Sequence, residues 1–506
     1  MNRPPIALFS VVAVLGVGLA VGRAGDERAT AARPATAVRD TRPVDGAVAV
    51  CPELLKEGED VVSRLTAGVA TPGEVSVRAA TLTPGEGLGA VVLDQGASVG
   101  ALNLKSASAV AAIITATGPQ SGGLEVEQVS RGADGPNRGW AGTRCEAPTA
   151  DSWFLGGTTV AGHSSQLVLV NPFDDPALVR VELYGAKGLI DVPELDGIVL
   201  KPRARNVKEL ANLAPDEPLL AVHVVAREGR VAPAIRVHRT RGTLPLGVDW
   251  LPRLTEPATR IDIPGIPTGN GARRLYVYVP GEDPAYLRVQ LTLPDGQIVP
   301  AGFEDVRVDP GQPVVLNLAD VLTVVNQRTA EKTMRPVALR IYAEGGPVFA
   351  TAFADSKSRF LAIREMSFVG PAEPLTGPTL VTEARNKGKM DCALLFHAPD
   401  GPARLTIRTL LSRGEKGKSV TKVVDVPQGQ LVVYPYSRLP EDPLQSVVIT
   451  PEPDMAPVYA SRYIFEVGRR GPLFTTQALV TQPTAGYDVP LVQSDPTAAL
   501  PVRPAE

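Results

Sequence analysis

The four histidines are the residues of this chain best suited to acid–base or metal chemistry near neutral pH. They are His163, His223, His238 and His397, and none has another histidine or cysteine at helical or tight-turn spacing, as a metal site normally requires. His223 and His238 fall on neighbouring predicted strands and could approach each other. Half-buried or exposed strand positions explain them better, so the sequence predicts no metal site.

A glycine-rich passage has part of the spacing of a phosphate-binding loop. Gly157, Gly162 and Ser164 carry the pattern, but His163 stands where a lysine would supply the fixed positive charge. A helix should follow such a loop, whereas an apolar strand follows here. The passage therefore predicts a glycine-rich turn.

The other residue types for catalysis do not form a recognisable pattern. No serine stands in the Gly-x-Ser-x-Gly elbow of acyl-transfer hydrolases. Acidic pairs such as Asp174-Asp175 and Glu441-Asp442 lie in predicted turns, where solvated carboxylates are the ordinary case. We expect a protein that is not an enzyme, with no catalytic residue, no cofactor and no metal ion.

The elements that would position any site come from a passage that recurs four times. It consists of an apolar strand, a Gly/Pro turn and a second strand that carries a small residue. Equivalent positions are Leu124, Val231, Val348 and Val458, separated by 107, 117 and 110 residues. A period of about 100 residues is the size of one β-sandwich domain.

Alternating apolar and polar residues predict the strands between these passages, as in Leu287, Val289 and Leu291. The fold class we expect is all-β, with tandem immunoglobulin-like or fibronectin-like sandwiches in a row. Helix is expected to be minor: Asn206–Leu213 and Leu318–Val325 are candidates for short helices within loops, and Pro52–Thr66 has a better helical period. The expected units are 49–149, 150–255, 256–370 and 376–482.

The chain begins with an uncharged apolar stretch over residues 4–22. Its length suits an uncleaved membrane anchor or a secretory signal, and we assign 1–24 to this role. Residues 25–48 are predicted to be a flexible stalk, and 483–506 a disordered tail. The bulk of the chain is then expected outside the cell membrane, or secreted if the segment is cleaved.

Three cysteines are present. Cys51 opens the first repeat and Cys145 follows it, so a disulfide between them would close one unit, as an oxidising compartment permits. Two free thiols are the alternative. Cys392 falls within an apolar strand and is predicted to be a small buried hydrophobe.

Charge and aromatic content limit the classes of partner. The 51 basic and 54 acidic residues are nearly balanced, which argues against nucleic acid as a partner. Trp153, Phe154 and Trp250 stand at the starts and ends of units and are candidate exposed aromatic contacts. Packing beneath a first strand or between units is the alternative for these rings.

Several short motifs together resemble a known family. They are Cys51-Pro52, Arg144-Cys145, Trp153-Phe154-Leu155-Gly156-Gly157, Asn171-Pro172, Val231-Ala232 and Val248-Asp249-Trp250-Leu251-Pro252. Over roughly 51–468, the chain resembles an uncharacterised actinobacterial family of membrane-anchored extracytoplasmic proteins that contain a domain of unknown function. The resemblance implies location and architecture and supplies no activity.

These observations predict a membrane-anchored scaffold or interaction module of the cell envelope. Its partners would be envelope proteins or cell-wall glycan. The alternative is an array of polysaccharide-binding modules that works with a glycosyltransferase or a hydrolase.

Overall fold

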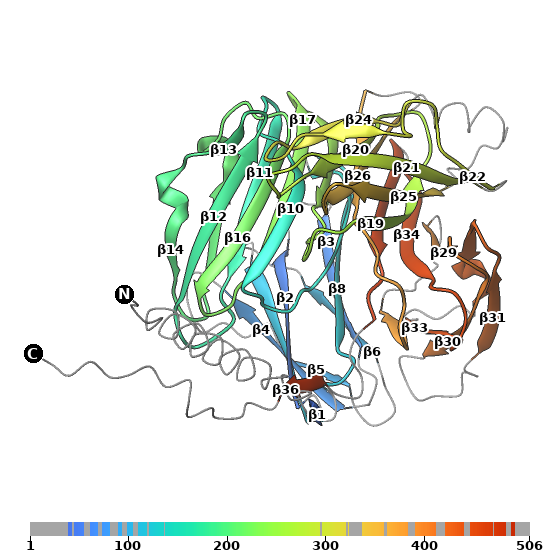
Figure 1. Ribbon diagram of the computed structural model, residues 1–506. Coiled ribbons are helices and arrows are strands. Elements are labelled where there is room, and N and C mark those ends of the chain that lie inside the picture. Colours follow the sequence, from blue (N-terminus) through green and yellow to red (C-terminus); the bar gives the residue numbers. More distant parts are fainter. Residues whose placement is uncertain are drawn as a thin grey trace, which may run out of the picture. The chain divides into compact units, whose positions relative to one another are not determined.

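The structure is a computed structural model in which the regular secondary structure of the described residues is almost entirely β-strand (Figure 1). The residues that it describes are 39–42, 45–54, 61–68, 73–80, 90–93, 99–104, 110–118, 121–135, 137–293, 296–319, 322, 336–358, 362–382, 390–410, 420–439, 446–468, 470–481 and 487–490.

The first two repeats comprise β2 to β18. The first contains β2 (Gly46–Leu54), β3 (Val61–Gly68), β4 (Gly73–Ala80), β5 (Ala90–Leu93), β6 (Val99–Leu104), β7 (Val110–Thr117), β8 (Glu125–Gly132) and β9 (Gly139–Arg144). The second contains β10 (Asp151–Gly157), β11 (His163–Val170), β12 (Ala177–Gly185), β13 (Gly188–Ile190), β14 (Asp196–Leu200), β15 (Arg205–Glu209), β16 (Leu220–Glu228), β17 (Ala232–Arg241) and β18 (Leu244–Trp250). Two 3-10 helices, η2 (Pro193–Leu195) and η3 (Leu210–Asn212), lie in its loops.

The last two repeats comprise β19 to β35. The third contains β19 (Arg260–Pro267), β20 (Arg273–Tyr278), β21 (Ala285–Leu293), β22 (Gly296–Ile298), β23 (Val306–Val308), β24 (Val314–Asn317), β25 (Pro336–Glu344), β26 (Phe349–Lys357) and β27 (Arg364–Val369). The fourth contains β28 (Thr379–Val381), β29 (Met390–Ala398), β30 (Ala403–Leu410), β31 (Thr421–Val426), β32 (Gln430–Pro435), η4 (Tyr436–Arg438), β33 (Ser446–Pro451), β34 (Tyr459–Gly468) and β35 (Gly471–Ala478).

Each repeat is built from two antiparallel sheets with the same strand order. In the first repeat the orders are β2-β7-β4-β5 and β6-β3-β8-β9, and the other three repeats follow this scheme. The second strand, β3, pairs with β6 and β8, whereas in the immunoglobulin order the second strand pairs with the first. The all-β sandwich prediction is therefore confirmed at the level of class, but the strand order is a different one.

The recurring passage marks the same place in every repeat. Leu124, Val231, Val348 and Val458 lie directly before β8, β17, β26 and β34, which we call the return strands. A further strand follows each return strand and pairs with it: β9, β18, β27 and β35. We call these four the last strands.

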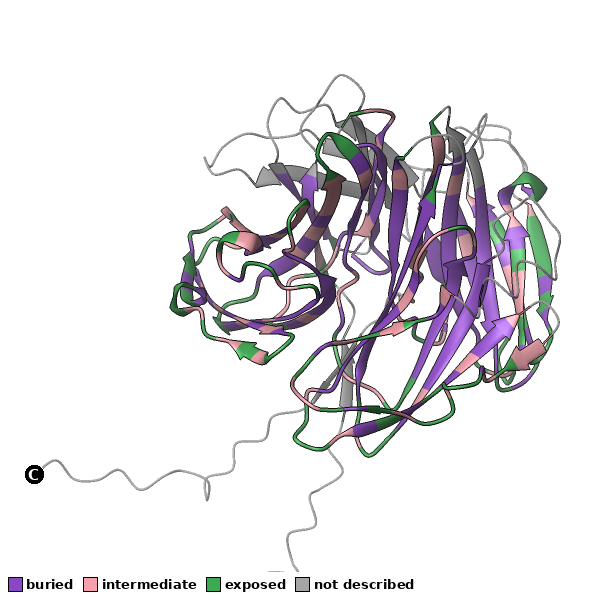
Figure 2. Cartoon of the chain, turned by 90° about the horizontal axis from the view of Figure 1, so that it is seen from above, coloured by how far each residue is buried: buried purple, intermediate pink, exposed green. Residues whose placement is uncertain are grey.

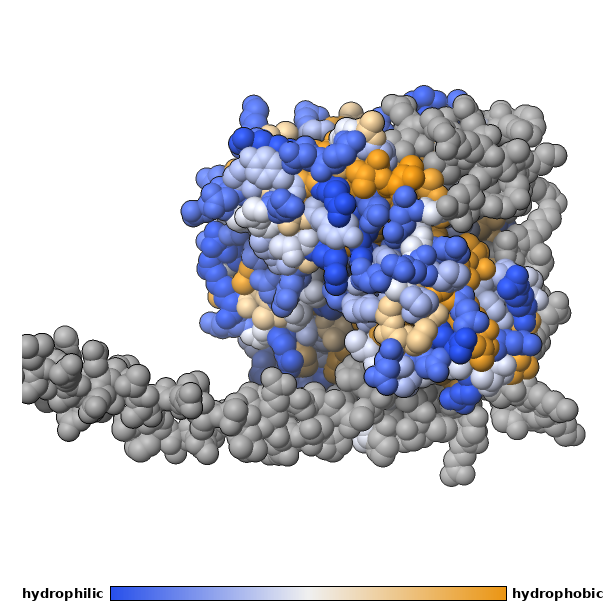
Figure 3. Space-filling view, turned by 45° about the vertical axis from the view of Figure 1, so that its right-hand side comes forward, coloured by the Kyte–Doolittle hydropathy of each residue, from blue (hydrophilic) through white to orange (hydrophobic). Residues whose placement is uncertain are grey.

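The sandwich cores come from the alternation that the sequence shows. In β12, Val179, Val181 and Leu183 are buried, and they pack against Leu167 and Leu169 of the opposite sheet. Buried positions fill the strand interiors, and exposed ones lie in loops and edge strands (Figure 2). Figure 3 shows one face of the molecule, where hydrophobic residues form small groups among hydrophilic ones.

The four repeats do not form a row, so that expectation is wrong. The last strands contact one another in a closed cycle, β9 with β18, β18 with β27, β27 with β35, and β35 with β9. Residues 44–484 accordingly form one compact unit. We call β9, β18, β27 and β35 together the four-strand cycle.

Every apolar core extends into the next repeat. The core of the second repeat includes Tyr278 and Phe349 of the third, and that of the third includes Leu395 and Phe474 of the fourth. The core of the fourth includes Trp140 of the first. A further cluster joins the first repeat to the second. Shared burial of this kind couples neighbouring sandwiches through the hydrophobic effect.

Strands also occur where the sequence predicted none. β1 (Arg39–Arg42) pairs with β36 (Tyr487–Pro490) in a separate small unit, within the ranges predicted as stalk and tail. β2 and β3 occupy most of the described part of Pro52–Thr66, so the helix predicted there is wrong.

The predicted anchor over residues 4–22 lies outside the described residues. Within the part of the chain that the structure describes, no helix is both long and apolar enough to cross a membrane.

Candidate functional site at the end of the four-strand cycle

The interior of the four-strand cycle is polar, and its links repeat from one repeat to the next. The backbone N–H of Phe368 in β27 donates to Oδ2 of Asp249 in β18, at 2.9 Å. In the same way, the N–H of Thr476 in β35 donates to Oγ of Ser367 in β27, at 3.1 Å. A buried polar side chain on one last strand thus accepts from the backbone of the following one.

Close approach of the strands requires small residues in the cycle. A Cβ on Gly142 of β9 would lie 3.0 Å from Nε2 of Gln477 and 3.1 Å from Cγ2 of Thr475. Gly247 of β18 has a φ of 115°, and a Cβ there would lie 2.7 Å from the backbone nitrogen of Met366. Glycine is therefore the residue that fits at Gly247, whereas a Cβ at Gly142 would require the side chains of Gln477 and Thr475 to move by a few tenths of an ångström.

Two buried carboxyls have raised pKa values in this interior. Asp249 is 1% exposed, and burial raises its pKa to about 8, against the hydrogen bonds it accepts from backbone N–H groups. Glu365 is fully buried, and burial raises its pKa well above 4.5, with a further rise from Asp249. The guanidinium of Arg138, which is 1% exposed, opposes that rise. Burial thus favours the neutral form of both carboxyls.

Ion pairs close the cycle between the fourth repeat and the first. Nη1 of Arg462 donates to Oε2 of Glu127 at 2.5 Å, and both residues are buried. Arg131 forms two hydrogen bonds to Glu466, at 2.8 and 2.7 Å. Removal of one partner from a buried pair leaves an uncompensated charge, so the Arg462–Glu127 pair fixes the two ends of the unit together.

A pocket of about 110 Å³ lies where the four last strands end. Each repeat contributes to it from the end of its last strand. The residues from these ends include Thr143, Arg144, Trp250, Leu251, Phe368, Gly370, Thr476 and Gln477. We call this the terminal pocket, and it is our candidate functional site.

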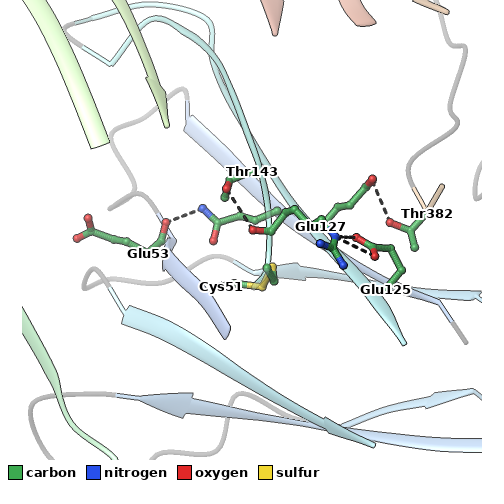
Figure 4. The surroundings of a disulfide bond; sticks show 9 residues. Cys51, Glu53, Glu125, Glu127, Thr143 and Thr382 are labelled. Atoms are coloured by element: carbon green, nitrogen blue, oxygen red, sulfur yellow. Dashed lines mark hydrogen bonds and ion pairs between the residues drawn. A yellow bond between two sulfur atoms is a disulfide. The ribbon is translucent and has the colours of Figure 1, made fainter. Parts of the chain in front are cut away.

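The predicted disulfide is confirmed. Cys51 and Cys145 are bonded, with their Cα atoms 4.3 Å apart and a sequence separation of 94. Figure 4 shows the bond beside the side chains of Glu53, Glu127 and Thr382. The backbones of Val50 and Glu146 form a β-bridge next to it, at the edge of the terminal pocket. The bond therefore holds one wall of the candidate site. Cys392 is buried and forms no disulfide, as expected for a small buried hydrophobe.

The candidate aromatic residues lie inside the protein. Phe154 is 1% exposed and Trp250 is 3% exposed, and both line the terminal pocket. Trp153 is half-buried and stacks on His223 at 4.0 Å and on Phe349 of the third repeat at 5.0 Å, measured between ring centroids. All three rings pack within or between repeats, which was the alternative to exposed aromatic contacts. Phe154 and Trp250 form no exposed platform.

The histidines lie in separate settings. His223 is in β16 and His238 is in β17, which belong to opposite sheets, so the prediction that they share neighbouring strands is wrong. His223 contacts Asp151 and Glu182, at 2.8 and 3.1 Å. His397 is fully buried, and burial lowers its pKa to about 3. Among the described residues, no group of three or more His, Cys, Asp or Glu is placed to hold a metal ion.

Sequence reasoning missed the residues that line the cycle. Asp249 stands in one of the motifs that carry the family resemblance, and the sequence predicts no role for it. Ser367 and Gly142 are a serine and a glycine in short strands, which carry no chemical signal of their own. A search for a second short strand after each return strand would have brought the four last strands to attention.

Comparisons with known proteins place the chain in a family without assigning an activity. No curated protein matches it. Among solved structures, the crystal structure of Thermotoga maritima 1070 is similar over 23% of this chain and 95% of that one, at 13% identity and a TM-score of 0.18. The model of a family of unknown function, DUF5719, matches residues 100–452. That match covers more than half of the sequence, and the chain therefore belongs to the DUF5719 family.

Proposed function

We propose that this protein is a non-enzymatic scaffold or interaction module of the cell envelope. The apolar stretch over residues 4–22 would hold it on the outer side of the membrane, or direct its secretion if that stretch is cleaved. The resemblance to membrane-anchored extracytoplasmic proteins of actinobacteria supports this location. Envelope proteins are the expected partners.

The observation that carries the proposal is the closed four-strand cycle. Because each apolar core extends into its neighbour and ion pairs join the fourth repeat to the first, the sandwiches form one compact unit. Such a unit presents its loops and edge strands at fixed positions, which suits a scaffold. The disulfide supports an oxidising compartment.

The test is affinity capture of the full chain from cross-linked envelope membranes. We expect a defined set of envelope proteins to be captured by the wild type and lost with Arg462→Met, which opens the buried pair that joins the fourth repeat to the first. Arg404→Met is the matched control, because its partner Asp425 is exposed. Recovery of the chain from the cytoplasmic fraction, or equal capture by all three proteins, would contradict the proposal.

The second candidate function is binding of envelope polysaccharide. The terminal pocket favours it, because Trp250, Phe154 and Phe368 line a space that also contains polar side chains. Sugar sites combine aromatic surface with hydrogen-bonding groups in this way.

A further inference from the structure

The first repeat has a sheet edge that is covered at one point and open beyond it. β2 is the outermost strand of its sheet and pairs with β7. On its other side, Val50 and Glu146 exchange two backbone hydrogen bonds, with N–H to O distances of 2.9 and 3.2 Å. This single bridge covers the outer edge of β2 at Val50.

The bridge fixes the direction of the other backbone groups of β2. Successive residues of a strand direct their N–H and C=O groups to opposite edges, so Val48 and Gly46 direct theirs to the same side as Val50. The C=O of Asp45 accepts from Gly118, directly after β7, as this alternation requires. No described residue bonds to the backbone N–H or C=O of Val48 on the outer side.

Pro148 explains why the cover stops. In the register of the bridge, Pro148 would stand opposite Val48, and a proline has no N–H to donate. The chain turns away at this point, because Thr149 pairs with Val231 of the second repeat. The sequence thus leaves the edge open at Val48 and Gly46.

A hollow of about 320 Å³ lies beside this open edge, and we call it the β2 groove. Residues 46–49 all line it, although their side chains alternate between the two faces of the sheet. A space that contacts both faces lies along the edge of the strand, where the backbone groups are. Gly46 is exposed and Val48 is partly exposed, so a ligand can reach them. The volume is within the ~300–1,000 Å³ of ordinary ligand sites.

The open edge carries no charge. Residues 46–49 are glycine, alanine, valine and alanine, whereas natural edge strands are commonly protected by charged side chains or proline. Gly123, Leu124 and Ala147 form further small or apolar parts of the lining. An accessible, uncharged edge beside a groove is suited to an extended peptide that adds a strand to the sheet.

One exposed cation lines the β2 groove. The guanidinium of Arg230 lies 5.5 Å from the ring centroid of Phe173, and both residues belong to the lining. No ion pair joins Arg230 to a carboxylate of the described part of the chain. Arg144, the other arginine of the lining, already pairs with Glu125 at 2.7 Å. The charge that remains available favours an acidic group on the ligand.

We propose that the β2 groove binds an extended segment of a partner protein that carries an acidic side chain. The segment adds a strand to the sheet of β2 through the N–H and C=O groups of Val48 and Gly46, and its carboxylate pairs with Arg230. This inference deepens the proposed function, on which it rests, by giving the chemistry of the partner.

The first test is selection of a phage-displayed library of random octapeptides on the purified full chain in detergent. We expect enrichment of sequences that combine alternating β-branched residues with one aspartate or glutamate. The enriched peptide is then synthesised, together with a version in which the acid is replaced by its amide. The amide version should bind about tenfold more weakly. No enrichment, or equal affinity of the two peptides, would overturn the proposal.

Hydrogen exchange resolved to single amides tests the edge directly. In the free protein the amide of Val48 should exchange quickly, and that of Ala49, which faces β7, slowly. Bound peptide should slow exchange at Val48 by more than about tenfold and leave Ala49 unchanged. Protection of Val48 before peptide is added would show that this chain or a second copy occupies the edge. That result, or unchanged exchange at Val48 in the complex, would contradict the assignment.

Two variants separate the backbone contact from the charge contact. Arg230→Gln should weaken the acidic peptide about tenfold and leave the amide version unaffected. Arg241→Gln is the matched control, because Arg241 is an exposed arginine of the same repeat outside the β2 groove. Val48→Pro removes the outer N–H without taking a hydrogen bond from β7, and it should abolish binding of both peptides. Equal affinities of Arg230→Gln and Arg241→Gln for the acidic peptide would contradict the role of Arg230.

Capture from envelope membranes separates this inference from the proposed function. If Arg230→Gln loses the peptide but captures the same envelope proteins as the wild type, the β2 groove is not the partner site, and the scaffold function stands. Peptide binding by a protein that is recovered from the cytoplasmic fraction would overturn the proposed function and leave the groove assignment standing.

Discussion

The sandwich cores and the interior of the four-strand cycle are two buried regions of opposite character. The cores contain aliphatic and aromatic side chains such as Leu405 and Phe396, both fully buried. The cycle interior contains Asp249, Glu365 and Ser367, which are equally buried. One region gains its stability from apolar area, and the other has to satisfy every polar group it buries.

This difference separates what forms each repeat from what fixes the repeats to one another. Any sandwich with the same alternation of apolar and polar residues can bury an apolar face. The hydrogen bonds from Phe368 to Asp249 and from Thr476 to Ser367, in contrast, form only when the last strands meet in one register. We infer that the polar interior specifies how the last strands meet. It would do so at some cost in stability, as buried polar groups do in other proteins.

The largest effect is expected from the apolar region. Phe396→Ala should lower the free energy of unfolding by about 3–5 kcal/mol, because it removes a fully buried ring from the core of the fourth repeat. Urea unfolding measures the change. Val423→Ala is the control, since Val423 is 60% exposed and should change stability by less than about 0.5 kcal/mol. Similar losses in both variants would remove the contrast between core and surface.

Breaking the closure of the cycle should cost about 3 kcal/mol. Arg462→Met leaves the carboxylate of Glu127 buried without its guanidinium. Arg404→Met, at an exposed pair with Asp425, should cost at most about 1 kcal/mol in the same urea experiment. If both variants unfold at the wild-type midpoint, the buried pair does not hold the first and fourth repeats together.

Loss of the disulfide should cost about 2–4 kcal/mol. The double variant Cys51→Ser, Cys145→Ser removes the covalent closure of the first repeat. The second and third repeats are closed instead by backbone β-bridges, Trp153–Leu254 and Asp262–Ala372, which the variant leaves intact. Hydrogen exchange should therefore rise in β2 and β9 more than in β10 or β19. A uniform rise across all repeats would show that the bond stabilises the whole unit equally.

The sequence predicted the apolar region much better than the polar one. Alternation in β12 and β21 and the Cys51–Cys145 bond could be foreseen, because burial on one face imposes a period of two and the two cysteines lie at the ends of one repeat. The closure between Glu127 and Arg462 joins residues 335 apart in sequence, and an isolated charge gives no local sign of such a partner. The terminal pocket depends on that closure and was equally hidden.

The smallest effect concerns pH and comes from the polar region. Because the pKa of Asp249 is raised to about 8 in the folded protein, folding retains a proton that the unfolded chain has released. Stability should therefore fall as the pH rises from about 4 towards 8. From pH 5 to pH 6 alone, the wild type should lose about 1 kcal/mol more than Asp249→Asn. Parallel curves of thermal stability against pH for the wild type and the variant would contradict the raised pKa of Asp249. Glu365, whose pKa is also raised, accounts for a pH dependence of stability that remains in the variant.

The closed cycle itself is tested most directly by the distance between its two ends. Asp134 and Arg470 form an ion pair between the first and fourth repeats, and both are solvent-accessible. Spin labels at Asp134→Cys and Arg470→Cys, with Cys392→Ala as background, should give one narrow distribution confined to distances shorter than a single strand, ~20 Å, because the two side chains are in contact. A distribution centred at several times that length would show that the repeats stand in a row and would contradict the account.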